Sequence, residues 1–247
     1  TITQSQRYIN FLDRMQWSVR RLIISGLHVH IGVESGEKAI AITNGMTRYI
    51  PLLIGLSANS PFFGDELTGL ASTRTKIFEG LPTAGLPPFL KNYSEFQKFM
   101  RTLQKANSIQ SIREVWWDIR PHPAFGTVEI RVCDAVPSIE EMVNLAAFIQ
   151  SLVVGLSNLY DDGAQLPILD PWVIQENKWR ATRYGLDADI ILDEGGSLQS
   201  LKGAIMETID KILPIAENLG CRNELINLSD IVENNDSPYQ RQIAQYQ

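Results

Sequence analysis

Two segments of this chain, residues 27–33 and 127–133, alternate apolar and polar side chains with the period of two that a β-strand imposes. A third segment, residues 115–120, has a similar pattern. Their ionisable residues fall on one face of each strand: His28, His30, Asp118, Arg120, Glu129 and Arg131. A dry core could not accept such a set without a large desolvation penalty. The pattern therefore predicts a small sheet with one apolar face, and a polar face that lines a wet cleft for ions or a charged ligand.

Apolar residues at intervals of three and four predict that helices make up most of the remaining chain. The expected helices cover residues 5–22, 37–57, 94–106, 138–159, 171–184, 197–219 and 222–233. Residues 58–92 are rich in turn-forming residues and are expected to be mostly loop, and the last fourteen residues to be loosely held. A few antiparallel strands with segregated helices predict an α+β fold, with helices packed on one face of the sheet.

Composition excludes several classes of protein. The chain has 247 residues, 44% of them hydrophobic, and a formal charge of −6, which argues against nucleic acid or an anionic membrane as partner. No uninterrupted apolar stretch of about 18 residues is present, so we expect no membrane span. Only two cysteines occur, Cys133 and Cys221, which favours a reducing, cytoplasmic location. We expect Cys133 to be buried and inert.

Four of the chemically suggestive motifs also have plainer interpretations that the sequence leaves open. A His-x-His strand can be a hydrogen-bonded or solvent-facing pair, and an alternating Glu-x-Arg can be an exposed face with a cross-strand ion pair. Asn59 and Ser60 can be a helix stop before Pro61. Lys178 and Arg183, five apart on an expected helix, can be a solvated basic face. The motifs therefore need a wider context before roles are assigned.

Five motifs, in order along the chain, supply that context: GLHVHIG, LSANSPFF, STRTKIFEGLPTAG, WWDIRPHPAFGTVEIRVCDA and ENKWRATRYGLDA. They resemble the second type of glutamate–cysteine ligase, a family also called carboxylate–amine ligases, from about residue 26 to about residue 188. A fainter likeness follows at residues 237–242. The sheet strands are also similar, more remotely, to those of the glutamine synthetase catalytic fold. The resemblance implies that residues 1–247 are one catalytic domain fragment, with sheet and active-site loops to about 137 and a mainly helical remainder.

The family resemblance implies an ATP-dependent ligase with Mg²⁺ or Mn²⁺. Such enzymes phosphorylate a carboxylate, here the γ-carboxylate of glutamate, and let cysteine or another amine displace phosphate. The implied roles are metal ligation by His28 and Glu129, catalysis by Arg131 and Arg120, nucleotide binding by Lys178, Arg183, Asn59 and Ser60, and substrate binding by Arg74 and His30. Guanidinium groups suit both phosphate and carboxylate. Homo-oligomerisation is a further expectation, since the apolar helix from Ser138 would suit an interface as well as a core.

One family feature has no counterpart in this sequence: an N-terminal strand with paired glutamates that completes the metal sites. The sequence also lacks a starting methionine, so we expect Thr1 to begin an excised or processed piece. A magnesium ion would then lack its usual carboxylate shell. We therefore expect this polypeptide alone to bind nucleotide weakly and to turn over slowly or not at all. Two alternatives are a guanidino kinase-like phosphotransferase and a non-catalytic domain for binding or oligomerisation.

Overall fold

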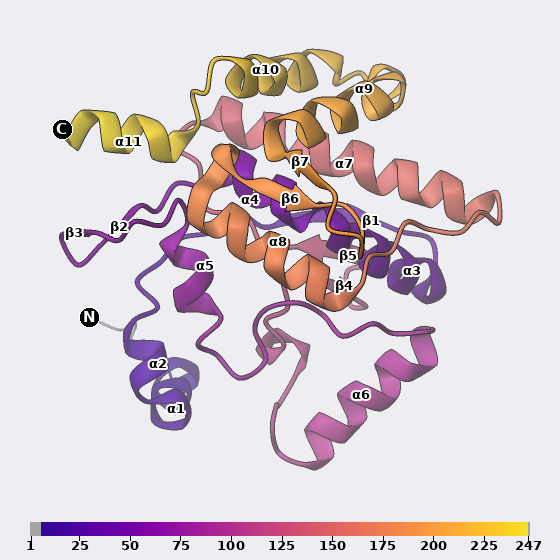
Figure 1. Ribbon diagram of the computed structural model, residues 1–247. Coiled ribbons are helices and arrows are strands. Elements are labelled where there is room, and N and C mark those ends of the chain that lie inside the picture. Colours follow the sequence, from indigo (N-terminus) through magenta and orange to yellow (C-terminus); the bar gives the residue numbers. More distant parts are fainter. Residues whose placement is uncertain (1–5, 247) are drawn as a thin grey trace.

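The computed structural model describes residues 6–246, and Figure 1 shows their arrangement. The α-helices are α1 (Gln6–Met15), α2 (Trp17–Arg20), α3 (Gly36–Met46), α4 (Ile50–Ser57), α5 (Thr73–Phe78), α6 (Tyr93–Lys105), α7 (Ile139–Asp161), α8 (Pro171–Tyr184), α9 (Leu201–Leu219), α10 (Arg222–Glu233) and α11 (Pro238–Tyr246). Short 3-10 turns are η1 (Thr47–Tyr49), η2 (Ile112–Glu114) and η3 (Gly185–Asp187). The strands are β1 (Val29–Gly32), β2 (Phe62–Phe63), β3 (Glu66–Leu67), β4 (Ile119–His122), β5 (Thr127–Ile130), β6 (Asp189–Ile191) and β7 (Leu198–Ser200).

The principal sheet is antiparallel, with strand order β1-β5-β4. Val29 lies opposite Ile130 and Ile31 opposite Val128, while on β4 Ile119 also lies opposite Ile130. These apolar side chains share one face because successive residues of a strand point to opposite sides. β2 pairs with β3, and β6 with β7, as separate two-stranded ribbons. The mixture of antiparallel sheet and helices confirms the α+β prediction.

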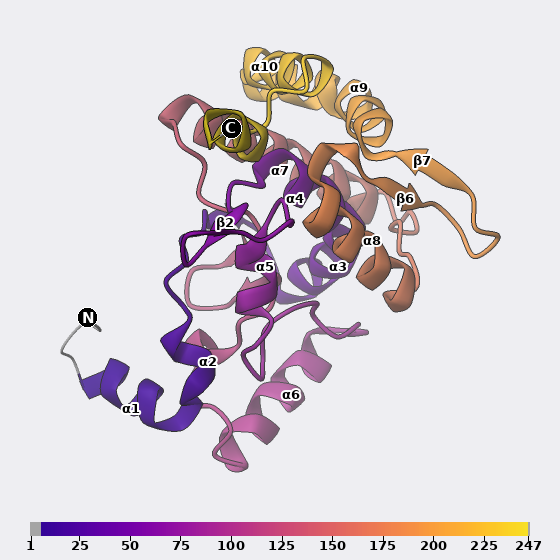
Figure 2. The ribbon, with the colours of Figure 1, turned by 60° about the vertical axis from the view of Figure 1, so that its left-hand side comes forward.

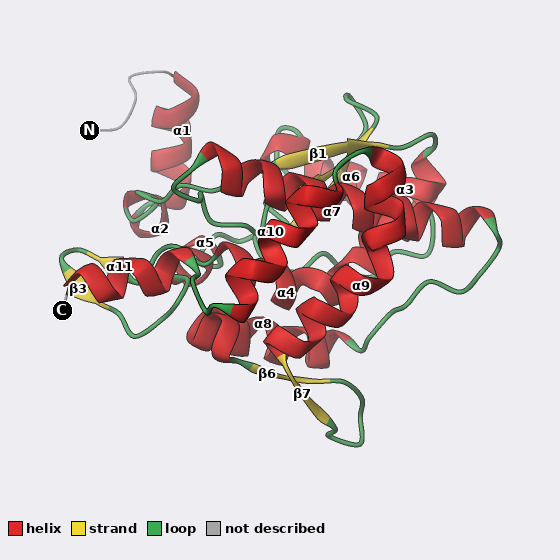
Figure 3. Ribbon diagram, turned by 90° about the horizontal axis from the view of Figure 1, so that it is seen from above, coloured by secondary structure: helices red, strands yellow, loops and turns green. Residues whose placement is uncertain are grey.

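Helices cover the apolar face of the principal sheet. α3 contacts β4, β5 and α7, and α7 in turn contacts α9 and α10. Val128, Ile130 and Phe148 of this core have no exposed surface. Figures 1 and 2 show α9 and α10 beyond α7 at one end of the molecule, and α1, α2 and α6 at the other. Viewed from above in Figure 3, β1 runs beside α3 and α7.

Local capping signals placed some helix ends correctly and others wrongly. The N-cap expected at Ser138 is confirmed, since the Glu141 backbone N–H donates to its hydroxyl over 3.1 Å. Ser94 is not a cap, because Asn92 caps α6 and accepts from the Glu95 N–H over 2.9 Å. The helix expected from residue 197 begins at Leu201, since residues 198–200 pair with β6.

Several other elements differ from expectation. The helix expected over residues 5–22 starts outside the described residues at position 5 and is interrupted at Gln16, whose φ of 47° is incompatible with an α-helix. The strand expected from residue 115 begins only at Ile119. The loop expected over 58–92 contains β2, β3 and α5. The expectation of a loosely held C-terminal segment is wrong up to residue 246: α11 buries Tyr239 against Ala58 and Ala71, and residue 247 lies outside the described residues.

Two helical stretches, Gly36–Ser57 and Ile139–Asp161, are long and apolar enough by length and composition to cross a membrane. Of their most apolar windows, 83% and 50% respectively are buried inside the protein. Both contact neighbouring helices and strands of the core. Packing in that core accounts for the apolar sequence of Gly36–Ser57, whereas half of the Ile139–Asp161 window is not buried.

Candidate active site

Strand register aligns the ionisable residues of the principal sheet in cross-strand rows. Glu129 on the central strand lies opposite His30 on one side and Arg120 on the other. The neighbouring row contains Arg131, whose backbone N–H donates to the Asp118 carbonyl over 2.8 Å. Because alternation puts residues i and i+2 on one face, both rows project from the face opposite the apolar core. Alternation in the sequence thus becomes a cluster of charges in three dimensions.

The Glu129 carboxylate is held by two guanidinium groups at the centre of this face. Arg120 Nε donates to Oε2 over 2.7 Å, and Arg131 Nη1 donates to Oε1 over 2.5 Å. Burial acts to raise the pKa of Glu129, but the two positive charges outweigh it and hold that pKa below its ordinary value. Glu129 is therefore ionised at neutral pH. These three groups carry a net charge of +1, which the Asp118 carboxylate of the neighbouring row offsets.

His28 lies beside Glu129 and Arg131, at the more open part of the cluster. Its Nδ1 is 3.5 Å from Glu129 Oε1 and 3.4 Å from Arg131 Nη1, and 40% of its side-chain surface is exposed. Burial and the Arg131 charge lower the pKa of His28 to about 4. The imidazole is therefore neutral at pH 7 and has a lone pair available. The expected juxtaposition of His28 and Glu129 is present, while their role as metal ligands stays a prediction.

Arg131 and Arg120 differ in how many of their N–H donors already have acceptors. Arg131 Nε is buried and has no hydrogen-bond partner among the described residues. Arg120 is more fully engaged, since its Nη1 also donates to the carbonyls of Ile112 and Val115 over 2.6 and 2.5 Å. Arg131 thus retains one unused donor, which is shielded from solvent, whereas the Arg120 contacts fix Glu129 and the η2 turn. Catalytic roles for both residues stay predictions.

The expectation of a wet cleft is wrong for most of the polar face. Asp118, Arg120, Glu129 and Arg131 are each at least 93% buried, and they are paired with other charged groups. Mutual pairing and hydrogen bonding satisfy these charges where solvent was expected to do so. Only the two histidines keep about a third or more of their side chains exposed.

His30 lies at the exposed end of the central row. Its Nε2 is 3.6 Å from Glu129 Oε1, and its Nδ1 is 3.0 Å from the Thr127 hydroxyl. The ring packs edge-on against His122, with centroids 5.8 Å apart. These contacts fit the hydrogen-bonded interpretation of the His-x-His strand. A substrate-binding role for His30 stays a prediction.

Asp134 organises a second buried network, at the end of β5. Its carboxylate accepts hydrogen bonds from the Asn59 backbone N–H over 2.9 Å, the Ser60 hydroxyl over 2.7 Å and the Ser72 hydroxyl over 2.9 Å. Arg74 Nη1 is 3.7 Å away. Burial raises the pKa of Asp134, although Arg74 and the three donors oppose that shift. Asn59, Ser60 and Arg74, which sequence motifs had selected separately, thus meet at one carboxylate.

The Arg74 guanidinium ties α5 to the end of β5. Nη1 donates to the Val132 carbonyl and Nη2 to the Arg131 carbonyl, each over 2.9 Å. A Cβ atom at Gly26 would lie 2.3 Å from Arg74 Nη2, so only glycine leaves room for this guanidinium. Arg74 also lines a cavity of about 250 Å³ together with Asn59, Ser60 and Asp134. Substrate binding by Arg74 and nucleotide binding by Asn59 and Ser60 stay predictions for this cavity.

Lys178 and Arg183 occupy different environments on α8. Lys178 Nζ is 2.5 Å from Asp118 Oδ2 and 2.7 Å from Glu79 Oε1, and its side chain is 1% exposed. Burial acts to lower the pKa of Lys178, but the two carboxylates raise it above its ordinary value. Arg183 is exposed and lies over the ring of Tyr184. The described contacts therefore do not bring the two cations together, and their nucleotide-binding roles stay predictions.

A divalent ion fits the described residues poorly. No group of three or more His, Cys, Asp or Glu side chains within residues 6–246 is arranged to hold a metal. The candidate ligands are His28 and Glu129, and both oxygens of Glu129 already accept from guanidinium groups. Mg²⁺ prefers a shell of six oxygens. We therefore assign no chemical step to a metal at these residues.

Reasoning from sequence missed the acidic partners that hold this region together. Asp134 and Glu79 lie inside the motifs that suggested a family, but no role was assigned to them. The signal for Asp134 was its position three residues after Arg131 at a strand end, where a buried acid needs donors. Cys133 is buried as expected, and burial raises its pKa to about 12.

A family model and three relatives point to the same protein family. Glutamate–cysteine ligase family 2 matches the chain over residues 1–247. A relative from Frankia alni, provisionally named glutamate–cysteine ligase 2-1, is 47% identical over 98% of this chain and 63% of its own length. A relative from Thermobifida fusca, provisionally named glutamate–cysteine ligase 2, is 48% identical over 97% of this chain and 60% of its own length. A relative of the same provisional name from Mycobacterium tuberculosis is 42% identical over 98% of this chain and 64% of its own length.

A structural relative supports the fold independently. A crystal structure of glutamate–cysteine ligase from Francisella tularensis in complex with AMP superposes with a TM-score of 0.63, over 86% of this chain and 55% of that one, at 14% sequence identity. The chain spans about 60% of the length of the curated relatives described above. The match over all 247 residues, together with the sheet geometry, shows that this chain belongs to glutamate–cysteine ligase family 2.

Proposed function

We propose that the protein acts in ATP-dependent carboxylate–amine ligation, forming a γ-glutamyl amide from glutamate and cysteine or a similar amine. In this reaction the γ-phosphoryl group of ATP is transferred to the γ-carboxylate. The amine nitrogen then attacks the acyl carbon, and the C–O bond to phosphate breaks. The products are ADP, phosphate and the amide, and the amine loses a proton. Family membership makes ligation the first activity to test.

The pair of buried guanidinium groups of Arg120 and Arg131 on the sheet face is the observation that carries the proposal. Phosphoryl transfer spreads negative charge over oxygen atoms, and preorganised donors stabilise that charge best in a site that excludes water. Arg131 is buried, is oriented by Glu129, and keeps its Nε without a partner among the described residues. Nε is shielded from solvent, so a phosphoryl or carboxylate oxygen would have to approach from the exposed His28 side of the cluster to accept from it. Glu129 would then act by positioning Arg131.

Nucleotide binding is a separate part of the proposal. It is supported by the fold shared with the Francisella tularensis enzyme, which was crystallised with AMP. Within this chain the cavity beside Asn59, Ser60 and Arg74 supplies hydroxyl, amide and guanidinium groups suited to phosphate or carboxylate. Mg²⁺ or Mn²⁺ would shield phosphate charges when bound, but the described ligands form at most part of its shell. Cytoplasmic location and oligomeric state stay predictions.

A hydroxylamine trap tests the proposed chemistry. Glutamate, ATP, Mn²⁺ and hydroxylamine are incubated with the protein, and γ-glutamyl hydroxamate and phosphate are both measured. An acyl-phosphate intermediate yields hydroxamate, whereas a kinase that phosphorylates a guanidino nitrogen yields none. We expect slow formation of both products in equal amounts. Calorimetry with Mn-ATP is run in parallel, and a flat trace with no hydroxamate would favour the non-catalytic alternative.

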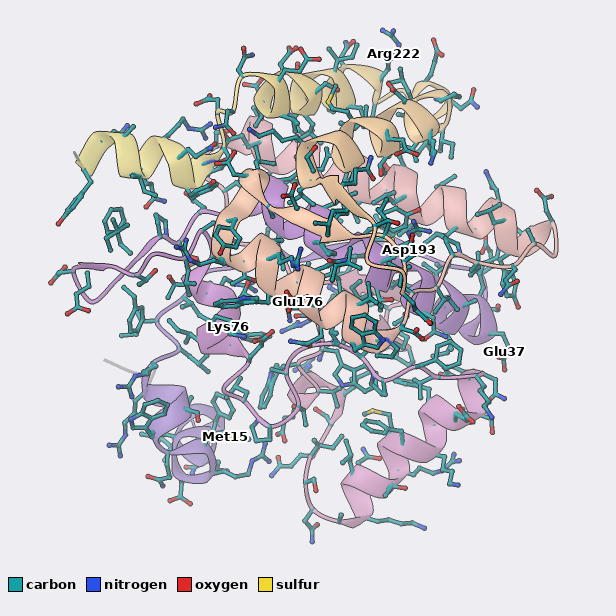
Figure 4. All side chains as sticks on the ribbon, in the orientation of Figure 1. Met15, Glu37, Lys76, Glu176, Asp193 and Arg222 are labelled. Carbon is teal, nitrogen blue, oxygen red and sulfur yellow. The ribbon has the colours of Figure 1, made fainter. Side chains whose placement is uncertain are left out.

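A matched pair of arginine variants connects any activity to the site. Arg131→Lys keeps the charge but loses the planar set of donors, so we expect a fall of about 100-fold in hydroxamate formation. Arg222→Lys, on the exposed face of α10 (Figure 4), is the control and should retain the parent rate. Equal rates for both variants would remove Arg131 from the mechanism.

A further inference from the structure

One cavity lies outside the charged sheet face. It measures about 500 Å³ and is enclosed by three segments distant in sequence: the loop around Phe89, the start of α8 near Asp170, and the β6–β7 turn at Asp193 and Glu194. Figure 4 shows Asp193 on the strand connection that passes in front of α3 and α8. None of the ionisable residues of the sheet rows lines this cavity. A ligand of this cavity would therefore contact other residues than a ligand of the proposed ligation site.

The walls of this cavity are apolar and incompletely covered. Phe89, Ile168 and Leu192 line it and remain 53%, 46% and 40% exposed. Large apolar side chains that converge at one concave site are typical of ligand pockets. The volume is enough for an aromatic ring or a branched aliphatic group. The walls therefore favour a ligand with an apolar body.

The polar part of the lining has one sign of charge. Asp170, Asp193 and Glu194 are all acidic, and no lysine, arginine or histidine lines the cavity among the residues that the structure describes. Asp170 at the start of α8 and Glu194 in the β6–β7 turn line the same cavity although they are distant in sequence. Carboxyl groups that line one cavity are stabilised by a nearby cation. Because the same cavity joins these acids to apolar walls, an organic ammonium complements the lining.

We propose that this cavity binds a primary amine with an aromatic or branched aliphatic body. The ammonium group contacts Asp170 and Glu194, and the apolar body packs on Phe89, Ile168 and Leu192. Asn44, which is 7% exposed, holds the loop beneath the pocket through hydrogen bonds with the backbone of Leu90. Because that loop is fixed, the site needs no rearrangement to receive the ligand. The ligand is recognised by charge and apolar contact together.

Calorimetry on the complete 247-residue chain at pH 7, without ATP or glutamate, tests this site. The probe is 2-phenylethylamine, with 2-phenylethanol as the neutral analogue of the same shape and ethylamine as the cation without the ring. We expect 2-phenylethylamine to bind at least tenfold more tightly than either analogue. Equal binding of 2-phenylethanol would refute the ionic contact, and equal binding of ethylamine would refute the apolar one. Absence of binding by 2-phenylethylamine would refute the site.

Two conservative variants locate the binding. Glu194→Gln and Asp170→Asn remove one charge each while keeping side-chain shape, and each should weaken 2-phenylethylamine binding at least fivefold. Glu217→Gln, on an exposed position of α9, is the matched control and should bind like the parent. Binding that all three variants leave unchanged would place the amine elsewhere and refute the assignment. The result is independent of ligase activity, because no ligase substrate is present.

Discussion

Replacing Lys178 by methionine tests whether this residue anchors the fold or binds a nucleotide. Methionine fills a similar volume without charge, so the main change is the loss of the ammonium between Asp118 and Glu79. The Lys178 and Asp118 side chains are 1% and 4% exposed, so water cannot replace the lost partner. Removing one member of such a buried pair costs about 3–5 kcal/mol in the free energy of unfolding. For a chain of this size, that corresponds to a fall in Tm of about 6–20 °C.

Urea titration and thermal melts measure this loss, and two further variants make the result specific. Adding Asp118→Asn to Lys178→Met removes the uncompensated carboxylate and should recover at least half of the lost stability. Lys202→Met is the control, because the side chains of Lys202 and its partner Asp187 are 34% and 54% exposed and their pair should contribute less than about 1 kcal/mol.

Two results would refute the anchoring role of Lys178. One is a loss of less than about 1 kcal/mol for Lys178→Met, given that buried pairs contribute several times more. The other is a double variant that is no more stable than the single one. Unchanged stability together with weaker Mn-ATP binding would support a nucleotide contact by Lys178.

Three further predictions follow from the same region. Gly26→Ala places a Cβ against the Arg74 guanidinium and should lower the free energy of unfolding by about 1–3 kcal/mol; a urea midpoint equal to that of the parent would contradict this packing. The folded-state pKa of His28, about 4, lies below the ordinary 6.5, so protonation favours the unfolded chain and stability should fall as pH drops from 7 to 5. The free energy of unfolding should change by less than about 1.4 kcal/mol per pH unit, because solvent screens the half-exposed ring. In urea melts, the free energy of unfolding of His28→Gln should depend less on pH than that of the parent. Iodoacetamide at pH 8 should label Cys221 before Cys133 in the native protein, since burial raises the pKa of Cys133 to about 12, and peptide mass spectrometry showing equal labelling would refute its inertness.

Local sequence periodicity predicted the elements of the sheet face because strand geometry depends on neighbouring residues. Alternation along the expected strands predicted a shared face for Glu129 and Arg131, and another for His28 and His30. In the structure Arg131 directly follows β5 and His28 directly precedes β1. The cap at Ser138 was likewise a local signal. Where local signals competed, as at Asn92 and Ser94, the choice between them depended on the packing of the loop before α6.

The sequence by itself determined the fold class, the family motifs and the side of each strand on which the charges lie, because these depend on order and spacing along the chain. Tertiary structure decided which charges meet. Lys178 pairs with Asp118, 60 positions earlier, and Asp134 gathers donors from residues 62 to 75 positions away. The physical reason is desolvation: folding withdraws these groups from water, so each needs a partner that the topology brings within hydrogen-bond distance. Spacing along the chain does not determine that partner.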